Sequence, residues 1–483
     1  MGKKGKDKAR TEANFTLLPA KQNERSYGFI DQVAVQVCFG IAAWYFLAGA
    51  QTGYYVPLSE AIPSILVGNC VPLFLIAFAG FYSARFGVDS LTASQGAFGA
   101  KGPVVIIVMF VTQLAVSASM PMLLFGQLAI KFSARLGFPE FLCTETPGVV
   151  IWSLMALAIG IYIAYSGPDT MMWFSRISAV LMVGIIVWLC YYIIGEYGFD
   201  YIANAEPRGR IIIEGNEGLT KRWNNAAALE TNFGLGFSWA FMFGMFTRMG
   251  KSEGQAYHGC IWGWGIISCC AIMFGAVVAL ATGAYDPSDW ILEASEKSGM
   301  FALAIMGLIF MAVANISSIA INTYPGAIAI TSRWPKVKWG LAIALVGIPT
   351  IILLNPEVYY RISNIYAIVG LLTSVFAGIM TTETLFVSKG RVSIREFYDR
   401  KNGFKYYKGI NPAGFIAMAC GLVVYLLILN PLTYTSLTGL FPYTCAALPT
   451  YFITGIVYLI LMKCWILKKY PVTFLNNIEE KAE

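Results

Sequence analysis

Long apolar stretches separated by short polar segments make up the chain from residue 29 onwards. A membrane-spanning helix needs about 20 consecutive, mostly apolar residues. Tyr and Trp rings, which favour the membrane–water boundary, lie near the ends of several stretches, as at Tyr54 and Tyr191. The pattern predicts an all-α integral membrane protein with twelve transmembrane helices, at about 29–52, 59–84, 103–133, 146–166, 170–195, 226–247, 258–284, 300–328, 337–354, 360–388, 411–430 and 442–466.

Composition agrees with this pattern and adds an orientation. Of the 483 residues, 57% are hydrophobic and 13% are charged, whereas soluble domains carry about 25% charged residues. Placing both termini in the cytoplasm leaves 26 of the 34 lysines and arginines on the cytoplasmic side, as the positive-inside rule requires. We therefore expect a multi-pass protein of the plasma (inner) membrane. Its net charge of +7 reflects topology and contact with membrane lipid, not nucleic-acid binding.

The segments between the apolar stretches are too short to hold a catalytic domain. The longest outer loop covers about 196–225, and the chain has one histidine, His258. Residues 244–252 resemble a phosphate-binding loop, but they have five residues between the glycines instead of four and they end a predicted span. The ten cysteines include no C-x-x-C pair. The sequence predicts no enzyme, no cofactor and no nucleotide-driven motor. A sensor or scaffold would need a larger soluble domain, so a secondary transporter is favoured.

Two predicted spans are rich in glycine at corresponding positions of the two halves. The first contains Gly40 and Gly49, and the sixth contains Gly234, Gly236 and Gly244. Transporters use interrupted helices at such positions to expose backbone groups to ions and substrates. Glycine also permits close packing of helices in membranes. The sequence alone leaves both interpretations open.

The eighth span carries polar residues at its middle, in the stretch MAVANISSIAINTYPGAIAI at 311–330. Asn315, Ser318 and Asn322 follow the spacing i, i+3, i+7 and share one face of a helix. Ser317 lies about 100° away from that face. Polar residues in a span mark either helix packing or a ligand pathway. One helix could therefore contact two ligands.

Four segments resemble the nucleobase–cation symporter family, which includes cytosine/purine, uracil, allantoin and hydantoin permeases. They are residues 23–28 (NERSYG), 66–69 (LVGN), 83–103 (SARFGVDSLTASQGAFGAKGP) and 378–412 (GIMTTETLFVSKGRVSIREFYDRKNGFKYYKGINP). The resemblance covers about 23–430. It implies a LeuT-type fold and uptake coupled to Na⁺ or H⁺ by alternating access. The implied division is a tail at 1–28, a ten-helix core at 29–388, a basic loop at 389–410, two extra helices at 411–466 and a tail at 467–483, the core consisting of inverted repeats at 29–195 and 226–388.

The resemblance also implies a cation site between spans one and eight. Backbone carbonyls would come from Cys38, Ile41 and Ala314, and hydroxyls from Ser317 and Ser318. An alternative register would place Asn315 and Ile316 at the hydroxyl positions.

Neutral oxygens suit Na⁺, whereas proton coupling usually needs a titratable group in the core. Asp31 and Glu230 lie near span ends, and Glu383 lies near the cytoplasmic end of span ten. We therefore predict Na⁺ as the coupling ion.

The substrate site matches the family less closely. The family holds a flat ring between aromatic side chains of spans three and six and reads its edge with amides. The candidates here are Asn322, Gln113, Ser117, Phe237, Trp239, Gly236 and Trp44. Val116 or Ser117 stands where the family has Trp, and Ala42 stands where some members have Gln. The prediction is a Na⁺ symporter that imports a nucleobase-like heterocycle. The alternative is an H⁺-coupled or uncoupled carrier of another small polar solute.

Overall fold

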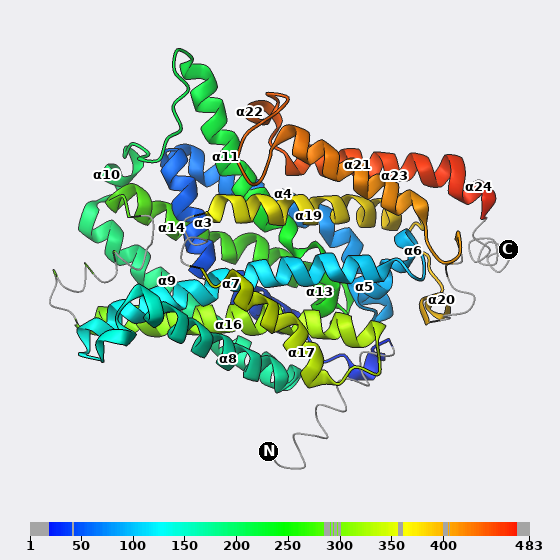
Figure 1. Ribbon diagram of the computed structural model, residues 1–483, viewed down its shortest axis with the longest axis horizontal. Helices are drawn as coiled ribbons and strands as arrows, with labels where there is room; N and C mark the ends of the chain where they lie inside the picture. The colour runs from blue at the N-terminus through cyan, green and yellow to red at the C-terminus, as the bar shows by residue number, and fades with distance from the viewer. Residues whose placement is uncertain are drawn as a thin grey trace, which may run out of the picture.

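A computed structural model of the chain describes residues 19–40, 43–284, 290, 293, 297, 301–355, 361–398, 404 and 406–470. Within these residues the regular structure is helical, apart from three isolated β-bridges. Most helices run along the long axis of the molecule (Figure 1).

The first half of the chain begins with a short 3₁₀ turn, η1 (Gln22–Glu24), and continues as a series of helices joined by short segments. Its helices are α2 (Phe29–Gly40), α3 (Ala43–Tyr55), α4 (Leu58–Phe86), α5 (Ser90–Ala93), α6 (Gln95–Phe98), α7 (Pro103–Arg135), η2 (Glu140–Leu142), η3 (Glu145–Val149), α8 (Val150–Tyr165), α9 (Pro168–Tyr197) and α10 (Phe199–Ala203).

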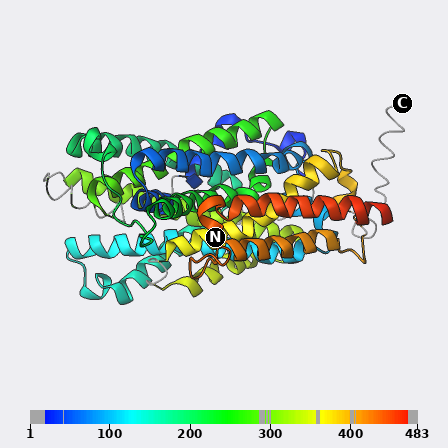
Figure 2. The same ribbon diagram turned by 90° about the horizontal axis from the view of Figure 1, so that it is seen from above.

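The second half contains α16, a long helix with polar residues at its middle, and it ends with two helices on one flank. Its elements are α11 (Glu217–Phe237), η4 (Ser238–Ala240), α12 (Phe243–Thr247), α13 (Glu253–Cys260), η5 (Ile261–Ile267), α14 (Ser268–Thr282), α16 (Phe301–Arg333), α17 (Trp339–Gly347), η6 (Ile348–Leu353), α19 (Ile362–Thr382), η7 (Glu383–Val387), α20 (Ile394–Tyr398), α21 (Pro412–Ile428), α22 (Phe441–Thr444), α23 (Ala447–Leu461), η8 (Met462–Ile466) and α24 (Leu467–Lys469). Figure 2 shows α21 and α23 lying side by side along that flank.

Helix occupies most of each of the twelve predicted ranges in the described part of the chain. Seven of the described helices, some continuous through a short π-helical turn, are both long and apolar enough to cross a membrane, and three more are apolar but shorter. The all-helical membrane class is therefore confirmed. The number of twelve crossings stays a prediction.

The sixth span begins earlier than its hydropathy indicates. We predicted a start at 226, but α11 begins at Glu217. The Asn216 side chain accepts a hydrogen bond from the Leu219 amide at 2.9 Å and caps the helix. The first turns of α11 carry exposed charged residues such as Lys221. A hydropathy scale therefore assigns these turns to a loop. A capped, polar helix start is therefore what sets the boundary.

Reciprocal glycines bring α3 and α14 into backbone contact. A Cβ added at Gly49 would lie 1.7 Å from the Ile272 carbonyl oxygen, and one at Gly275 would lie 1.9 Å from the Phe46 carbonyl oxygen. Any side chain at either position would push the two helices apart. Gly49 of the first span is therefore a packing residue.

The two loop segments that carry the family resemblance dock on each other. The Lys101 amide donates to the Gly409 carbonyl at 2.9 Å, and the Asn411 amide donates to the Phe98 carbonyl at 3.0 Å. The Tyr406 hydroxyl donates to the Gly96 carbonyl at 3.1 Å. We call this end of the molecule, near α5, α6 and α20, the loop end (Figure 1, right). The opposite end, near α10 and the start of α11, is the cavity end.

Candidate substrate and cation site

The sixth span is broken near its middle. Helix α11 ends at Phe237, a 3₁₀ turn covers Ser238–Ala240, and α12 begins at Phe243. In the first span, α2 and α3 are the described helices, and residues 41–42 between them lie outside the described part. A Cβ at Gly236 would lie 2.7 Å from the Gly68 carbonyl oxygen on α4. Gly236 therefore supports the break by close packing against α4.

The polar residues of α16 are all buried. Asn315, Ser317, Ser318 and Asn322 are exposed by 1% or less. The Ser317 hydroxyl donates to the Ala314 carbonyl at 2.9 Å, and the Asn322 amide nitrogen donates to the Ser318 carbonyl at 2.8 Å. These bonds lie within one helix and leave several lone pairs unused. A buried helix thus presents oxygens that local bonding does not consume.

Two amides of α16 have unfilled hydrogen-bonding positions. Within the described residues, neither the oxygen nor the nitrogen of Asn315 has a partner, and the Asn322 oxygen has none. An unpaired buried polar group costs about 1–3 kcal/mol. Such groups in a protein core call for an explanation, and a ligand supplies one.

Helix α2 packs against α9 and α16, which also pack against each other. Cys38 is fully buried, and its thiol donates to the Ser175 carbonyl on α9 at 3.0 Å. The Ser175 hydroxyl is itself buried without a partner among the described residues. Of the predicted cation ligands, Cys38, Ala314, Ser317 and Ser318 thus lie on helices that meet, whereas Ile41 lies outside the described residues. Ser175 is an additional oxygen that the sequence analysis missed.

Helix α7 packs against α16 and brings a second amide to the core. The Gln113 amide nitrogen donates to the Ser117 hydroxyl at 3.1 Å, and both side chains are buried. The Gln113 oxygen has no partner in the described part of the chain. Gln113 and Ser117, both predicted for the substrate site, therefore form one polar pair with acceptor capacity left over.

The predicted aromatic residues separate into two places. The Trp44 ring stacks on Tyr366 of α19 at 5.5 Å, and Tyr45 beside it contacts Trp264, which in turn contacts Trp239 at 4.4 Å. Trp44 and Trp239 therefore belong to one aromatic chain that links α3 to the turn in the sixth span. Phe237 instead stacks on Tyr451 of α23 at 5.4 Å, so its ring lies against the extra helices.

An aromatic stack that the sequence analysis did not identify crosses the break in the sixth span. Phe241 lies 5.4 Å from Phe110 of α7 and 4.2 Å from Phe376 of α19, measured between ring centroids. Phe110, Gln113 and Ser117 follow the spacing i, i+3, i+7 and share one face of α7. That spacing was visible in the sequence, but the partner rings come from distant segments.

Glu230 and Glu383, which the sequence analysis places near span ends, are both buried against the two extra helices. Glu230 accepts from the Tyr425 hydroxyl at 2.7 Å and from the Ala446 amide at 2.7 Å. Glu383 accepts from the Tyr458 hydroxyl at 2.6 Å. Glu230 thus ties α11 to α21 and to the start of α23, and Glu383 ties the end of α19 to α23. Hydropathy could not foresee this, because the burying surfaces come from α21 and α23.

A broken sixth span and a buried polar centre on α16 are features of a multi-pass, all-α carrier with a LeuT-type fold. Solved structures that are similar to this chain in fold include the nucleobase-cation-symport-1 transporter Mhp1. In its closed conformation with bromovinylhydantoin bound, the TM-score is 0.77 at 15% identity, covering 94% of this chain and 96% of that one. The inward-facing Mhp1 gives a TM-score of 0.75 at 17% identity, covering 94% of each chain. A Na⁺-coupled sialic acid symporter gives 0.58 at 13% identity, covering 95% of this chain and 96% of that one.

Comparison at the level of sequence gives the family. Residues 22–453 match the family model described as permease for cytosine/purines, uracil, thiamine and allantoin, and the chain belongs to this nucleobase–cation symporter family. A hydantoin permease from Microbacterium maritypicum is 22% identical over 452 residues, which cover 86% of this chain and 85% of that protein. The protein is a nucleobase-type transporter of the membrane and not an enzyme.

Proposed function

We propose that the protein imports a nucleobase-like heterocycle, a purine, a pyrimidine or a hydantoin- or allantoin-type compound, by symport with Na⁺. The observation that carries the proposal is a set of buried amide atoms that have no partner among the described residues. They are both polar atoms of Asn315 and the oxygen of Asn322 on α16, and the oxygen of Gln113 on the neighbouring α7. Heterocycles of this class have a rim of alternating hydrogen-bond donors and acceptors. A side-chain amide has both a donor and an acceptor, so it can pair with either kind of group. They also have flat faces that aromatic side chains can cover.

In the proposed substrate site, Asn322 and Gln113 read the edge of the ring, with Ser117 fixing the Gln113 amide. Phe110 and Phe241 supply the aromatic surface nearest to this pair, because Phe110 shares the α7 face of Gln113. Trp44 and Trp239 line the adjoining aromatic chain. The placement of Gly236 and Phe237 favours a supporting role for these two residues.

In the proposed cation site, the carbonyls of Cys38, Ile41 and Ala314 join the hydroxyls of Ser317 and Ser318, with Asn315 as the ligand in the other register. The buried hydroxyls fit Na⁺, a hard cation that binds neutral oxygen. The same helix would contact the substrate through Asn322. Each ligand would then favour an arrangement of α16 that the other also needs, which is the condition for coupling.

A second candidate keeps the carrier and replaces Na⁺ by H⁺, or removes coupling, for another small polar solute. The buried carboxylates Glu230 and Glu383 favour it, because ionisable groups inside membrane proteins often carry protons. In either case we propose a plasma-membrane location with cytoplasmic termini, which places the cavity end outside the cell.

The test is uptake by purified protein in liposomes, with radiolabelled uracil, hypoxanthine, allantoin and hydantoin. A Na⁺ gradient should drive accumulation of at least one of them, whereas a proton gradient without Na⁺ should not. Equal uptake on a proton gradient alone would show that the coupling ion is H⁺ and not Na⁺. Lack of thermal stabilisation by every compound, where a hundredfold excess over Kd should add about 2.7 kcal/mol, would refute the substrate class.

Two serines of α16 provide a matched pair for the cation site. Ser317 and Ser332 each donate to the carbonyl three residues before, at 2.9 and 3.0 Å. We expect Ser317→Ala to raise the Na⁺ concentration for half-maximal uptake about tenfold and Ser332→Ala to leave it unchanged. Equal effects of the two substitutions would assign Ser317 a helix-packing role.

A further inference from the structure

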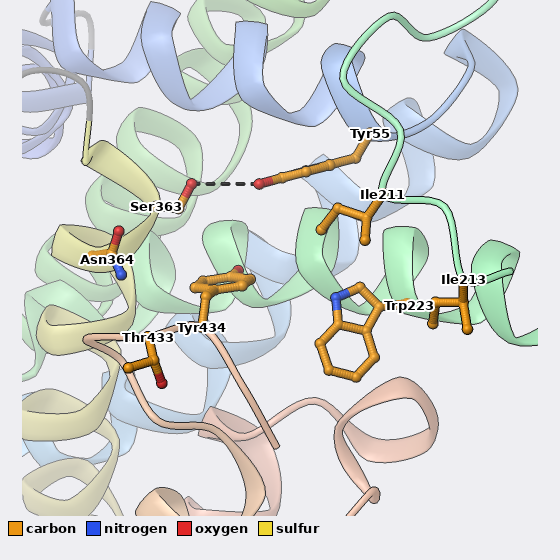
Figure 3. Close-up of a pocket in the computed structure, with 8 residues that line it drawn as sticks. All are labelled: Tyr55, Ile211, Ile213, Trp223, Ser363, Asn364, Thr433 and Tyr434. Atoms are coloured by element: carbon orange, nitrogen blue, oxygen red, sulfur yellow. Dashed lines mark hydrogen bonds between the residues drawn. The ribbon is translucent and has the colours of Figure 1, made fainter.

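A cavity of about 510 Å³ opens between α3, α11 and α19 at the cavity end, apart from the polar centre (Figure 3). Three aromatic residues line it: Tyr55 of α3, Trp223 of α11 and Tyr434 of the segment after α21. Its polar lining comes from Ser363, Asn364 and Thr433. None of its lining residues carries a formal charge. Cavities of about 300–1,000 Å³ with apolar walls and a few polar groups are typical of small-molecule sites.

One wall is an extended segment fixed on α11. The Asn224 side chain accepts from the Ile211 amide and donates to the Ile211 carbonyl, both at 2.8 Å. One turn earlier, the Thr220 hydroxyl accepts from the Ile213 amide at 2.9 Å and donates to its carbonyl at 3.2 Å. Both isoleucines line the cavity (Figure 3). Because side chains of α11 satisfy the backbone of this segment, the wall is preformed.

The opposite wall is fixed in a similar way. The Asn364 amide nitrogen donates to the carbonyls of Pro431 and Leu432 at 2.7 and 2.9 Å. The Tyr434 amide donates to the Asn430 carbonyl at 2.8 Å, which closes a tight turn with Tyr434 at a φ of 56°. This turn holds the Tyr434 ring against the cavity (Figure 3).

One long contact crosses the cavity between α3 and α19. The Tyr55 and Ser363 hydroxyls lie 3.5 Å apart, at the limit of a hydrogen bond (Figure 3). Tyr55 belongs to α3 and Ser363 to α19. A molecule in the cavity would contact both sides of this seam.

We propose that the cavity is a second binding site, for a flat, uncharged heteroaromatic molecule that lies against Trp223 and Tyr434. The hydroxyls of Ser363, Thr433 and Tyr55 would bond to its polar atoms. The bound molecule would join α3 and α11 to α19 and oppose their separation. Occupancy would therefore slow transport without competing for the polar centre.

The test is equilibrium dialysis of the purified full-length protein with tritiated caffeine. Caffeine is flat and neutral, and it has no N–H groups for the core amides to accept. We expect saturable binding whose affinity falls about tenfold in Trp223→Ala. A stacking contact between two rings contributes on the order of a tenfold change in affinity. Thr433→Trp should abolish binding because the Trp side chain would fill the cavity. Thr433 is exposed, so this substitution should leave the fold intact. Thermal unfolding of each variant checks that it is folded.

Two control variants separate this site from the central one. Tyr443→Ala removes another exposed ring at the same end, and Asn322→Ala alters the polar centre. Both should bind caffeine as the wild type does. Absence of saturable binding, or loss of it in Asn322→Ala but not in Thr433→Trp, would overturn the proposal. Since dialysis requires no uptake, failure of the proposed transport function would not be mistaken for failure here.

Discussion

Helix α19 is held differently at its two ends. At the cavity end, Ser363 faces Tyr55 across a cavity, and their hydroxyls are 3.5 Å apart. Toward the loop end, Phe376 stacks on Phe241 at 4.2 Å and lies parallel to Phe98 at 6.4 Å. The outermost turn of α19 thus meets α3 through a weak polar contact, one turn before Tyr366 stacks on Trp44. Toward the loop end the helix meets its neighbours through buried rings.

The difference indicates which end separates first. A hydrogen bond at 3.5 Å contributes little, whereas each aromatic pair adds about 0.5–1.5 kcal/mol beyond the area that it buries. Separating the Tyr55 and Ser363 hydroxyls therefore costs less than separating the rings around Phe376. A carrier opens alternately to the two sides of the membrane. Its ligands must therefore be able to reverse the difference in free energy between opening one end and opening the other. Three substitutions test this difference between the two ends.

Phe241→Ala should have the largest effect, because it removes the ring shared by Phe110 and Phe376. Truncating a buried Phe costs about 3–5 kcal/mol. We expect a marked fall in thermal stability and at least a tenfold loss of uptake for each folded molecule. Phe237→Ala is the matched control, since Phe237 is equally buried but packs on α23. If both variants lose stability and uptake in the same proportion, the Phe241 stack has no special role in transport.

Glu230→Gln should have an intermediate effect, confined to the cavity end. The Gln amide keeps the volume but cannot accept on both sides from Tyr425 and the Ala446 amide, which costs about 1–3 kcal/mol. We expect faster thiol labelling of a Ser363→Cys reporter, measured by mass spectrometry. Glu383→Gln, whose partner Tyr458 lies toward the loop end, should leave that labelling rate unchanged. Equal acceleration by both would show that the two ends are not independent.

Tyr55→Phe should have the smallest effect. It removes only the long contact with Ser363 and a second one of 3.5 Å from Gln51. We expect a stability change below about 0.5 kcal/mol and an uptake rate within a factor of two of the wild type. A tenfold change in uptake would mean that the Tyr55 hydroxyl, and not the rings at the other end of α19, limits transport.

The sequence was most informative where local periodicity decides the outcome. The apolar runs predicted the helices, and the spacing in α16 predicted a buried polar face on one helix. The loop segments at 83–103 and 378–412 predicted the family and turn out to dock on each other.

The sequence was least informative where a residue's role depends on a distant neighbour. Phe241 acquires its role from Phe110 and Phe376, and Glu230 is buried by helices almost 200 residues away. Phe237 looked equivalent to Trp239 in the sequence, yet the two rings lie in different places because α23 covers only one of them. The assignments of Asn322, Gln113 and the cation ligands stay predictions.

The reciprocal glycines of α3 and α14 have a consequence for motion. With Gly49 and Gly275 each in contact with the opposite backbone, neither helix can slide or rotate without the other. Because the two helices must move together, any ligand that displaces α3 in the first span would also displace α14 in the seventh. Gly275→Ala would then uncouple a movement, although residue 275 lies in a span to which no ligand is assigned.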